Sequence, residues 1–176
     1  MHRAYCDESE PGGGLDHCTY ILAAVIVDDS ERDALRSAVE RLRPARMKKL
    51  HWYEAIEVQR HTWRGLLRLA VATIIVRYDG SPARAERRRR RCLERLVFEL
   101  ESRAVRHVTI ESRGPALDRA DRRVLDAFRT HGVGRSIVWD HARGDGEPLL
   151  ALADIACGSR GTLRDEHLDV TEITVA

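Results

Sequence analysis

The 176-residue chain has no apolar run that approaches the roughly 18 residues of a membrane-spanning helix. It shows no charged-then-apolar leader either, because a strand-like pattern begins within a few residues of Met1. The formal net charge is only +2, which is too small to indicate nucleic-acid binding by itself. With 43% hydrophobic residues, the composition predicts a globular cytoplasmic protein that makes no membrane contact.

The chain also lacks any C-x-x-C pair, although it has four cysteines, namely Cys6, Cys18, Cys92 and Cys157. This spacing favours buried thiols in a reducing compartment over a disulfide framework. A zinc site built on His17 and Cys18 fits none of the usual ligand spacings. No internal repeat, linker or low-complexity segment divides the sequence, so we expect a single domain over residues 1–176.

Five segments carry strand patterns, at residues 3–7, Tyr20–Val27, Val71–Tyr78, His107–Ser112 and Ser136–Ala142. A turn-forming, glycine-rich stretch joins the first two, which predicts a hairpin-like start. The third is apolar on both faces and is therefore expected near the centre of the sheet. The last residues, 170–176, predict either a short edge strand or a poorly ordered end.

Helical patterns fill most of the remaining chain. A mostly helical insertion of about residues 30–69 separates the second and third strands. After the third strand, Ser81 is predicted as the N-cap of a long helix, with Pro82 at its first helical position and its end near Ala104. Two further helices are expected after the fourth and fifth strands.

This order of elements narrows the fold class. Three antiparallel strands followed by two right-handed crossover units make the ribonuclease H-like architecture, an α/β fold with a mixed sheet. We therefore predict a five-stranded ribonuclease H-like sheet flanked by helices, with the helical insertion between strands two and three. The first and fourth strands are neighbours in such a sheet.

Three acidic residues fall where this fold would bring them together. Asp7 ends the first strand, Glu111 ends the fourth, and Asp154 interrupts the apolar helical stretch "LLALADIACG". An ionised carboxylate in an apolar helix costs several kcal/mol unless it is paired, hydrogen-bonded, protonated or bound to a cation. Carboxylates close together also repel, and hard divalent ions such as Mg²⁺ or Mn²⁺ relieve that repulsion. The arrangement is typical of two-metal phosphodiester hydrolysis.

Three further residues are accessory candidates. Glu86, in the first turn of the long helix, is either a fourth metal ligand or the ion-pair partner of Arg90. Asp140 and His141 end the fifth strand, where they could position a water or shuttle a proton. Asp140 could also simply cap a turn.

The run Arg87–Arg91 opens the long amphipathic helix. One interpretation is a solvated helix start, in which Glu86 and Glu94 pair with Arg90 or Arg91 at helical spacing. The other is a patch that contacts phosphates. Both interpretations place the run at the surface.

The stretches "AYCDESE", "KLHWYEA", "TIESRG" and "EPLLALADIACG" resemble the DUF3800 family, which is regarded as ribonuclease H-like. The resemblance covers most of the chain and implies a nuclease-like site with Asp7 and Asp154. Two departures stand out. Glu10 follows Ser9 where the family usually has glycine, and Lys49 stands where the family's middle motif often has glutamate. That lysine weakens a metal-binding role for the middle segment, and His51 is either a substrate contact or structural.

The sequence thus predicts a Mg²⁺- or Mn²⁺-dependent nuclease or phosphodiesterase, with Asp7, Glu111 and Asp154 as ligands and DNA or RNA as the partner. The alternative is a non-catalytic ribonuclease H-like module that binds nucleic acid or protein, in which Asp154 is bonded to a backbone donor or to Arg113. A third possibility is a structural Asp154 in an unrelated fold, which would leave the first and fourth strands apart. An oligomer formed through a sheet edge is also possible.

Overall fold

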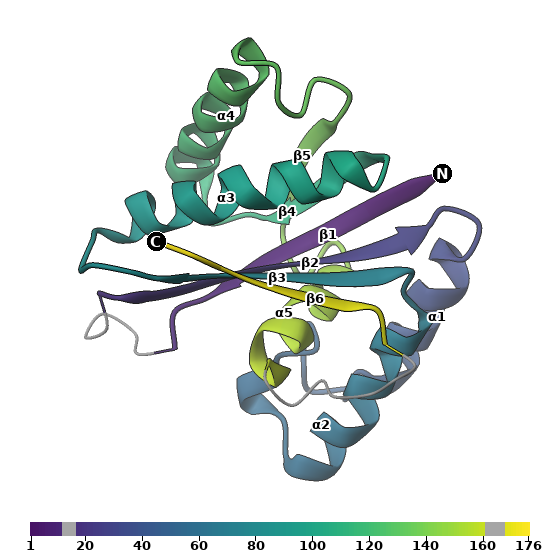
Figure 1. Cartoon of the computed structure of the whole chain (residues 1–176). Helices are drawn as coiled ribbons and strands as arrows, with labels where there is room; N and C mark the ends of the chain where they lie inside the picture. Colours follow the sequence, from purple (N-terminus) through teal and green to yellow (C-terminus); the bar gives the residue numbers. More distant parts are fainter. Residues whose placement is uncertain (12–16, 161–167) are drawn as a thin grey trace.

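The structure is a computed structural model that describes residues 1–11, 17–160 and 168–176, so most of the predicted glycine-rich turn lies outside the described residues. A mixed sheet is covered by helices on both faces (Figure 1). Its strands are β1 (His2–Ser9), β2 (Thr19–Asp28), β3 (Ala72–Asp79), β4 (Val105–Glu111), β5 (Val138–Ala142) and β6 (Val170–Val175). The helices are α1 (Arg32–Leu42), α2 (Glu57–Arg64), α3 (Ala85–Ser102), α4 (Pro115–Thr130) and α5 (Leu150–Ser159), with the short 3-10 helices η2 (Trp52–Glu54) and η3 (Gly65–Leu69).

The strand order is β5-β4-β1-β2-β3-β6. Strands β1, β2 and β3 pair antiparallel, whereas β1 with β4 and β4 with β5 pair in parallel. The predicted α/β class, the mixed sheet and the contact between the first and fourth strands are confirmed. The predicted strand count of five is wrong, because residues 170–175 form β6, a sixth strand parallel to β3; of the two predicted alternatives for this segment, the edge strand is the one found. Backbone hydrogen bonding to an open sheet edge orders this C-terminal segment, and local sequence pattern carries little information about such pairing.

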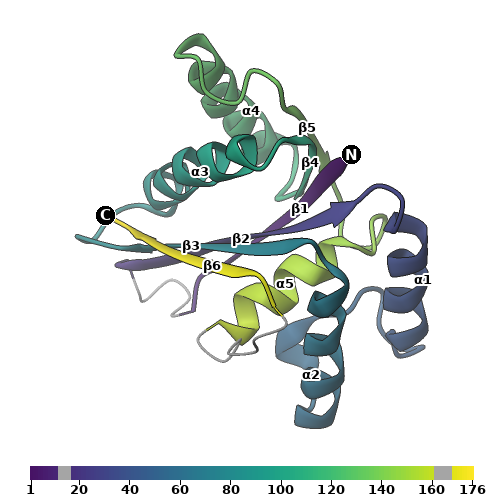
Figure 2. The ribbon, with the colours of Figure 1, turned by 45° about the vertical axis from the view of Figure 1, so that its right-hand side comes forward.

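Two apolar cores lie on opposite faces of the sheet. Helices α3 and α4 cover one face, while α1, α2 and α5 cover the other (Figure 2). Side chains alternate between faces along a strand. In β1, Tyr5 therefore points toward α5, and Ala4 and Cys6 point toward α3. The same alternation sends Asp7 to the α5 side and Glu8 to the α3 side.

The insertion between β2 and β3 is helical, as predicted, and it packs on α5. Gly158 of α5 shows how close this packing is, since an added Cβ there would lie 2.0 Å from Cδ1 of Trp52. No larger residue fits at position 158 without a shift of the tryptophan ring. The α5 glycine thereby fixes the start of η2 against the helix that carries Asp154.

The predicted start of α3 is wrong by about one turn. The helix begins at Ala85, and its N-cap is Arg84 in an extended conformation, not Ser81. Two contacts hold the preceding residues out of the helix. The hydroxyl of Tyr78 donates to the carbonyl of Ser81 at 2.8 Å, and the amide of Ala83 donates to the carbonyl of His17 at 3.0 Å. No helix in the described part of the chain is long and apolar enough to cross a membrane.

Candidate functional site

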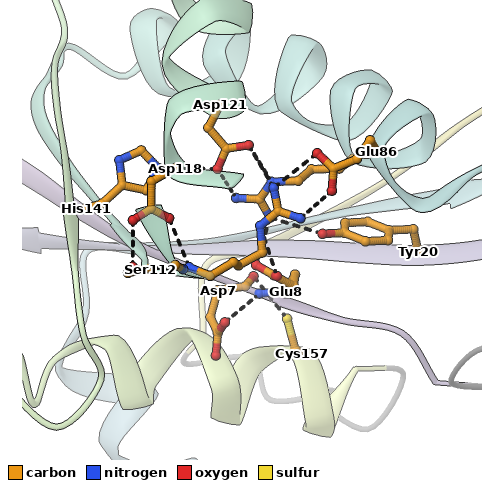
Figure 3. Close-up of polar contacts among 12 residues, drawn as sticks. Asp7, Glu8, Tyr20, Glu86, Ser112, Asp118, Asp121, His141 and Cys157 are labelled. Carbon is orange, nitrogen blue, oxygen red and sulfur yellow. Dashed lines mark hydrogen bonds and ion pairs between the residues drawn. The ribbon is translucent and has the colours of Figure 1, made fainter. Parts of the chain in front are cut away.

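Asp7, Glu111 and Asp154 gather at one end of the sheet on the α5 face. The parallel register of β1 and β4 pairs Cys6 with Ile110, so the next residues of the two strands are Asp7 and Glu111. Helix α5 packs on β1, and the thiol of Cys157 donates to the carbonyl of Asp7 at 3.5 Å. Figure 3 shows Asp7 pointing toward this helix. Three elements that lie far apart in the sequence therefore bring the predicted acids to one place.

The electrostatics of Asp7 reflect this crowding. Its side chain is buried, and its Oδ1 accepts a hydrogen bond of 2.8 Å from the amide of Glu8. Burial, followed by the negative charges of Glu111, Glu8 and Asp154, holds the pKa of Asp7 well above its usual range, although Lys49 lowers it. Carboxylates that lie this close together form a site at which a cation is favourable.

Lys49 is the cation that the structure supplies here. Its ammonium forms an ion pair with Oε1 of Glu111. Burial lowers the pKa of Lys49, but the hydrogen bond and the charges of Glu111, Asp7 and Asp154 raise it by more. The other oxygen, Glu111 Oε2, is buried and has no hydrogen-bond partner among the residues that the structure describes.

Asp154 fastens α5 to the insertion. Its Oδ2 accepts hydrogen bonds from the backbone amide of Trp52 at 2.9 Å and from Nδ1 of His51 at 3.0 Å. These two donors account for a carboxylate in an otherwise apolar helix. The sequence offered no signal for them, because Trp52 donates through its backbone and lies about a hundred positions away. The bond to Trp52 is the backbone contact that the non-catalytic hypothesis predicts.

His51 is expected to titrate in response to Asp154. The hydrogen bond that His51 donates to Asp154, and the negative charge of Asp154, raise the pKa of His51 against the opposing effect of partial burial. Because the pKa of His51 is higher in the folded than in the unfolded protein, the pair contributes its full stabilisation at pH values below the unfolded-state pKa of about 6.5. That stabilisation is lost as the pH rises through the folded-state pKa of His51. We therefore expect Asp154→Asn to lower the pKa of His51, measured by NMR titration with the exposed His61 as an internal reference. Identical His51 titration in both proteins would contradict the pairing.

The structure does not bring the other predicted residues into this group. Glu86 pairs with Arg113, at 2.6 Å, and not with the predicted Arg90. Asp140 is exposed on β5 and pairs in register with Thr109. His141 points to the α3 side of the sheet, where its Nε2 donates to Oδ2 of Asp121 at 3.3 Å.

A second polar cluster lies on that opposite face, around Arg89. Figure 3 shows its members Glu8, Tyr20 and Asp121. The Arg89 guanidinium is 1% exposed and makes two bonds to Asp121, at 2.9 and 2.7 Å, and one to Glu8 at 2.7 Å. Arg113 adds contacts to Asp121 at 3.0 Å and to Glu8 at 3.5 Å. Burial raises the pKa of Asp121, but the bonds from His141 and Arg89 hold it well below its usual range.

This cluster corrects both interpretations of the arginine run. Both interpretations predicted that the whole run is exposed. Only Arg87, Arg90 and Arg91 are exposed, whereas Arg88 and Arg89 are buried. The spacing of residues along the helix could have predicted this burial. Arg88 and Arg89 lie one turn before the buried Cys92 and Leu93, and therefore on the same face of α3. Only the predicted pair of Glu94 with Arg91 is found, at 3.5 Å.

Comparison with known proteins identifies the fold. A scan of protein families found no match, and neither did a search of curated proteins. Among solved structures, a chain of the PCNA:RNase HII complex from Archaeoglobus fulgidus has a TM-score of 0.61 at 13% identity, over 95% of this chain and 84% of that one. The fold is ribonuclease H-like. The ribonuclease H2 from Pyrococcus horikoshii OT3 has a TM-score of 0.51 at 10% identity, over 89% and 70% of the two chains.

On this ribonuclease H-like fold, the three acids suit a hard divalent cation in their chemistry, since each offers carboxylate oxygens. Glu111 Oε2 is the clearest such donor, being buried and unpaired within the described residues. As placed, however, no three His, Cys, Asp or Glu side chains within residues 1–11, 17–160 and 168–176 form a group that could hold a metal ion. Lys49 already provides positive charge among the same acids. The three acids thus offer the oxygen donors that a cation needs, but as placed they do not form a metal site, and the positive charge among them is that of Lys49.

Proposed function

We propose that this protein is a Mg²⁺- or Mn²⁺-dependent nuclease or phosphodiesterase that hydrolyses phosphodiester bonds of nucleic acid. The observation that carries the proposal is the convergence of Asp7, Glu111 and Asp154 from β1, β4 and α5. Burial raises the pKa of Asp7, and the charges of Glu111, Glu8 and Asp154 raise it further. A site with this much crowded negative charge favours a divalent cation. The names of the two structural neighbours, RNase HII and ribonuclease H2, support nucleic acid as the substrate class.

Each acid has one oxygen to offer to a cation. Asp7 uses Oδ1 for the Glu8 amide, Asp154 uses Oδ2 for Trp52 and His51, and Glu111 uses Oε1 for Lys49. The remaining oxygens, Asp7 Oδ2, Asp154 Oδ1 and Glu111 Oε2, would hold the metal. When bound, the metal would polarise the phosphoryl group and make a water more acidic.

Two other side chains would act on the substrate. Phosphodiester hydrolysis forms a bond from a water oxygen to phosphorus, with loss of one proton from that water, and breaks the bond to the leaving oxygen, which takes up a proton. Because Nδ1 of His51 is held by Asp154, its Nε2 is the nitrogen left to exchange that proton. The Lys49 ammonium would attract the phosphate into a site that is otherwise negative.

Two further parts of the proposal rest on sequence features. Membership of the DUF3800 family is supported by the order of its motifs, two of which supply Asp7 and Asp154. A cytoplasmic site of action is supported by four free thiols, three of which are buried.

The test combines metal binding with cleavage. We expect Mn²⁺ at about a hundredfold excess over its dissociation constant to add about 2.7 kcal/mol of stability, a rise in Tm of roughly 5–10 °C for a domain of this size. With the same metal, the purified chain should cleave at least one substrate among single- and double-stranded DNA, single- and double-stranded RNA, and RNA–DNA hybrid. No shift in Tm together with no cleavage would refute the proposal.

A non-catalytic module that binds nucleic acid or protein is the second candidate. The bond from the Trp52 amide to Asp154 favours it, because a hydrogen-bonded carboxylate needs no metal to be stable in the core. In that case the protein would bind an oligonucleotide or a protein without cleaving anything, and metal would leave its Tm unchanged.

A further inference from the structure

Tyr53 is an exposed aromatic residue at the edge of the acidic site. It is the central residue of η2, and a 3-10 helix has three residues per turn, so successive side chains point in different directions. Trp52 points inward and is only 5% exposed, whereas Tyr53 points outward and is 57% exposed. The short helix therefore buries one aromatic ring and presents the next one to solvent.

The position of Tyr53 is fixed at both ends. At the backbone, the hydrogen bond from the Trp52 amide to Asp154 ties η2 to α5. At the far end of the ring, a hydrogen bond of 3.1 Å joins the hydroxyl of Tyr53 to Oγ of Ser9, a buried residue at the end of β1. Ser9 lies two positions after Asp7 and therefore on the same face of the sheet. The ring thus extends from η2 to the strand that carries Asp7.

The ring of Tyr53 also meets the ring of His51. Their centroids are 6.2 Å apart and their planes make an angle of 80°, which is an edge-on arrangement. Nδ1 of His51 is held by Asp154, so Tyr53 lies directly beside a residue of the proposed site. An exposed ring that is already held in one orientation offers a binding surface at low entropic cost.

A nucleobase is the ligand that suits this ring. Every base has a flat π-face, and stacking of bases on aromatic side chains is a general mode of binding single strands without sequence preference. Within a duplex, both faces of a base are covered by its stacked neighbours. Only an unpaired or splayed base can therefore lie on Tyr53.

We propose that Tyr53 is a base-stacking platform that holds an unpaired nucleotide beside the acidic site, so that the substrate class is single-stranded DNA or RNA. This inference rests on nucleic acid as the substrate of the proposed function and specifies its strandedness. The stacking itself requires no metal ion, because it depends on the tyrosine ring and not on the carboxylates.

The test measures binding of a short fluorescent oligonucleotide in EDTA by fluorescence anisotropy. We expect the wild type to bind the single strand at least about fivefold more tightly than the duplex of the same sequence. Tyr53→Ala should weaken single-strand binding at least about fivefold and leave duplex binding unchanged. Tyr53→Phe keeps the ring and loses only the bond to Ser9, so it should bind within about threefold of the wild type.

Phe98→Ala is the matched control. Phe98 is an aromatic residue of α3 that is 56% exposed, on the helix layer that covers the opposite face of the sheet. Its removal should change neither single-strand nor duplex binding.

An abasic strand separates stacking from a merely structural role of Tyr53, because it carries the same phosphates without bases. We expect the wild type to prefer the normal strand over the abasic strand, and Tyr53→Ala to lose that preference by the same factor as it loses affinity. The salt dependence of binding should be equal in the two proteins, since no phosphate contact is removed.

Equal losses on normal and abasic strands, or no loss in a folded Tyr53→Ala, would overturn the inference. Tyr53→Leu replaces the alanine variant if circular dichroism shows that the latter is unfolded. If neither folds, the preference of the wild type for single over double strands and for normal over abasic strands decides.

The stacking and the proposed hydrolysis can fail separately. Cleavage with Mn²⁺ that neither favours single strands nor depends on Tyr53 would refute the stacking and leave the proposed function intact. Binding that depends on Tyr53, without cleavage of any substrate, would refute the hydrolysis and leave the stacking intact. A wild-type chain that binds no single strand would refute the stacking.

Discussion

Asp154→Asn is expected to lower kcat/KM for nucleic-acid cleavage at least about a hundredfold. The stabilisation that a metal gives to transition-state charge is several kcal/mol, and each roughly 1.4 kcal/mol corresponds to a factor of ten in rate. An amide keeps one oxygen, which can still accept the hydrogen bond from the Trp52 amide. It loses the negative charge that a cation and His51 both require. Steady-state kinetics with Mn²⁺ on the best substrate measure the loss.

The same variant should remain folded. We expect its free energy of unfolding without metal to change by less than about 1.5 kcal/mol, because the weakened hydrogen bonds are offset by reduced repulsion of Asp7. Its Tm should no longer rise with Mn²⁺. Asp126→Asn, which removes an exposed acid from α4, is the matched control and should behave as the wild type. Full activity in Asp154→Asn would make this carboxylate purely structural.

Arg89→Met is expected to cause the largest loss of stability, about 3–5 kcal/mol, because it leaves buried carboxylates without their partner. Asp121 and Glu8 both lose a direct ion pair, and Tyr20 loses a hydrogen bond of 3.0 Å. Arg113 also contacts Asp121 and Glu8, but it pairs with Glu86 as well and therefore does not replace the lost guanidinium. Urea unfolding at pH 7 measures the loss. Arg90→Met, at the exposed neighbouring position, should change stability by less than about 0.5 kcal/mol.

The loss in Arg89→Met should also shrink on acidification. In the wild type the folded-state pKa of Asp121 is depressed, so its contribution to stability is present above the unfolded pKa near 4 and is lost as pH falls through the folded value. Without Arg89, only His141 and Arg113 still lower the pKa of Asp121, and the pKa of Glu8, which burial already raises, rises further. The variant therefore gains stability relative to the wild type as pH falls from 7 to 5. An equal deficit at both pH values would show that lost packing, not an unpaired charge, causes the instability.

The Arg89 cluster and the acidic site meet in β1. Glu8 directly follows Asp7 within β1, so the two side chains point to opposite faces of the sheet. Arg89 and Arg113 hold Glu8 on the α3 face, and Asp7 lies on the α5 face. Fixing Glu8 therefore fixes the backbone that presents Asp7 to α5. The cluster is well placed to stabilise the end of β1 although none of its side chains belongs to the proposed metal site.

Much of the fold could be predicted from local pattern. Hydrophobic periodicity located β1 to β5, the helical insertion and the helix of Asp154, because each pattern depends on residues only a few positions apart. The order of these elements then predicted that β1 and β4 are neighbours, which brings Asp7 beside Glu111. The sequence alone thus determined the α/β architecture apart from its sixth strand, and it located the three acids at one end of the sheet.

Tertiary structure alone decided which partners these acids have. Lys49, His51 and the Trp52 amide reach Glu111 and Asp154 across 62 to 103 positions, and no local pattern reports such contacts. The sequence left open whether residues 170–176 form an edge strand, and pairing with β3 decided that they do. Partners of buried charges depend on how distant segments pack, whereas strands and helices depend on neighbouring residues. For that reason the sequence determined where the carboxylates lie, and the tertiary structure decided that a lysine lies among them.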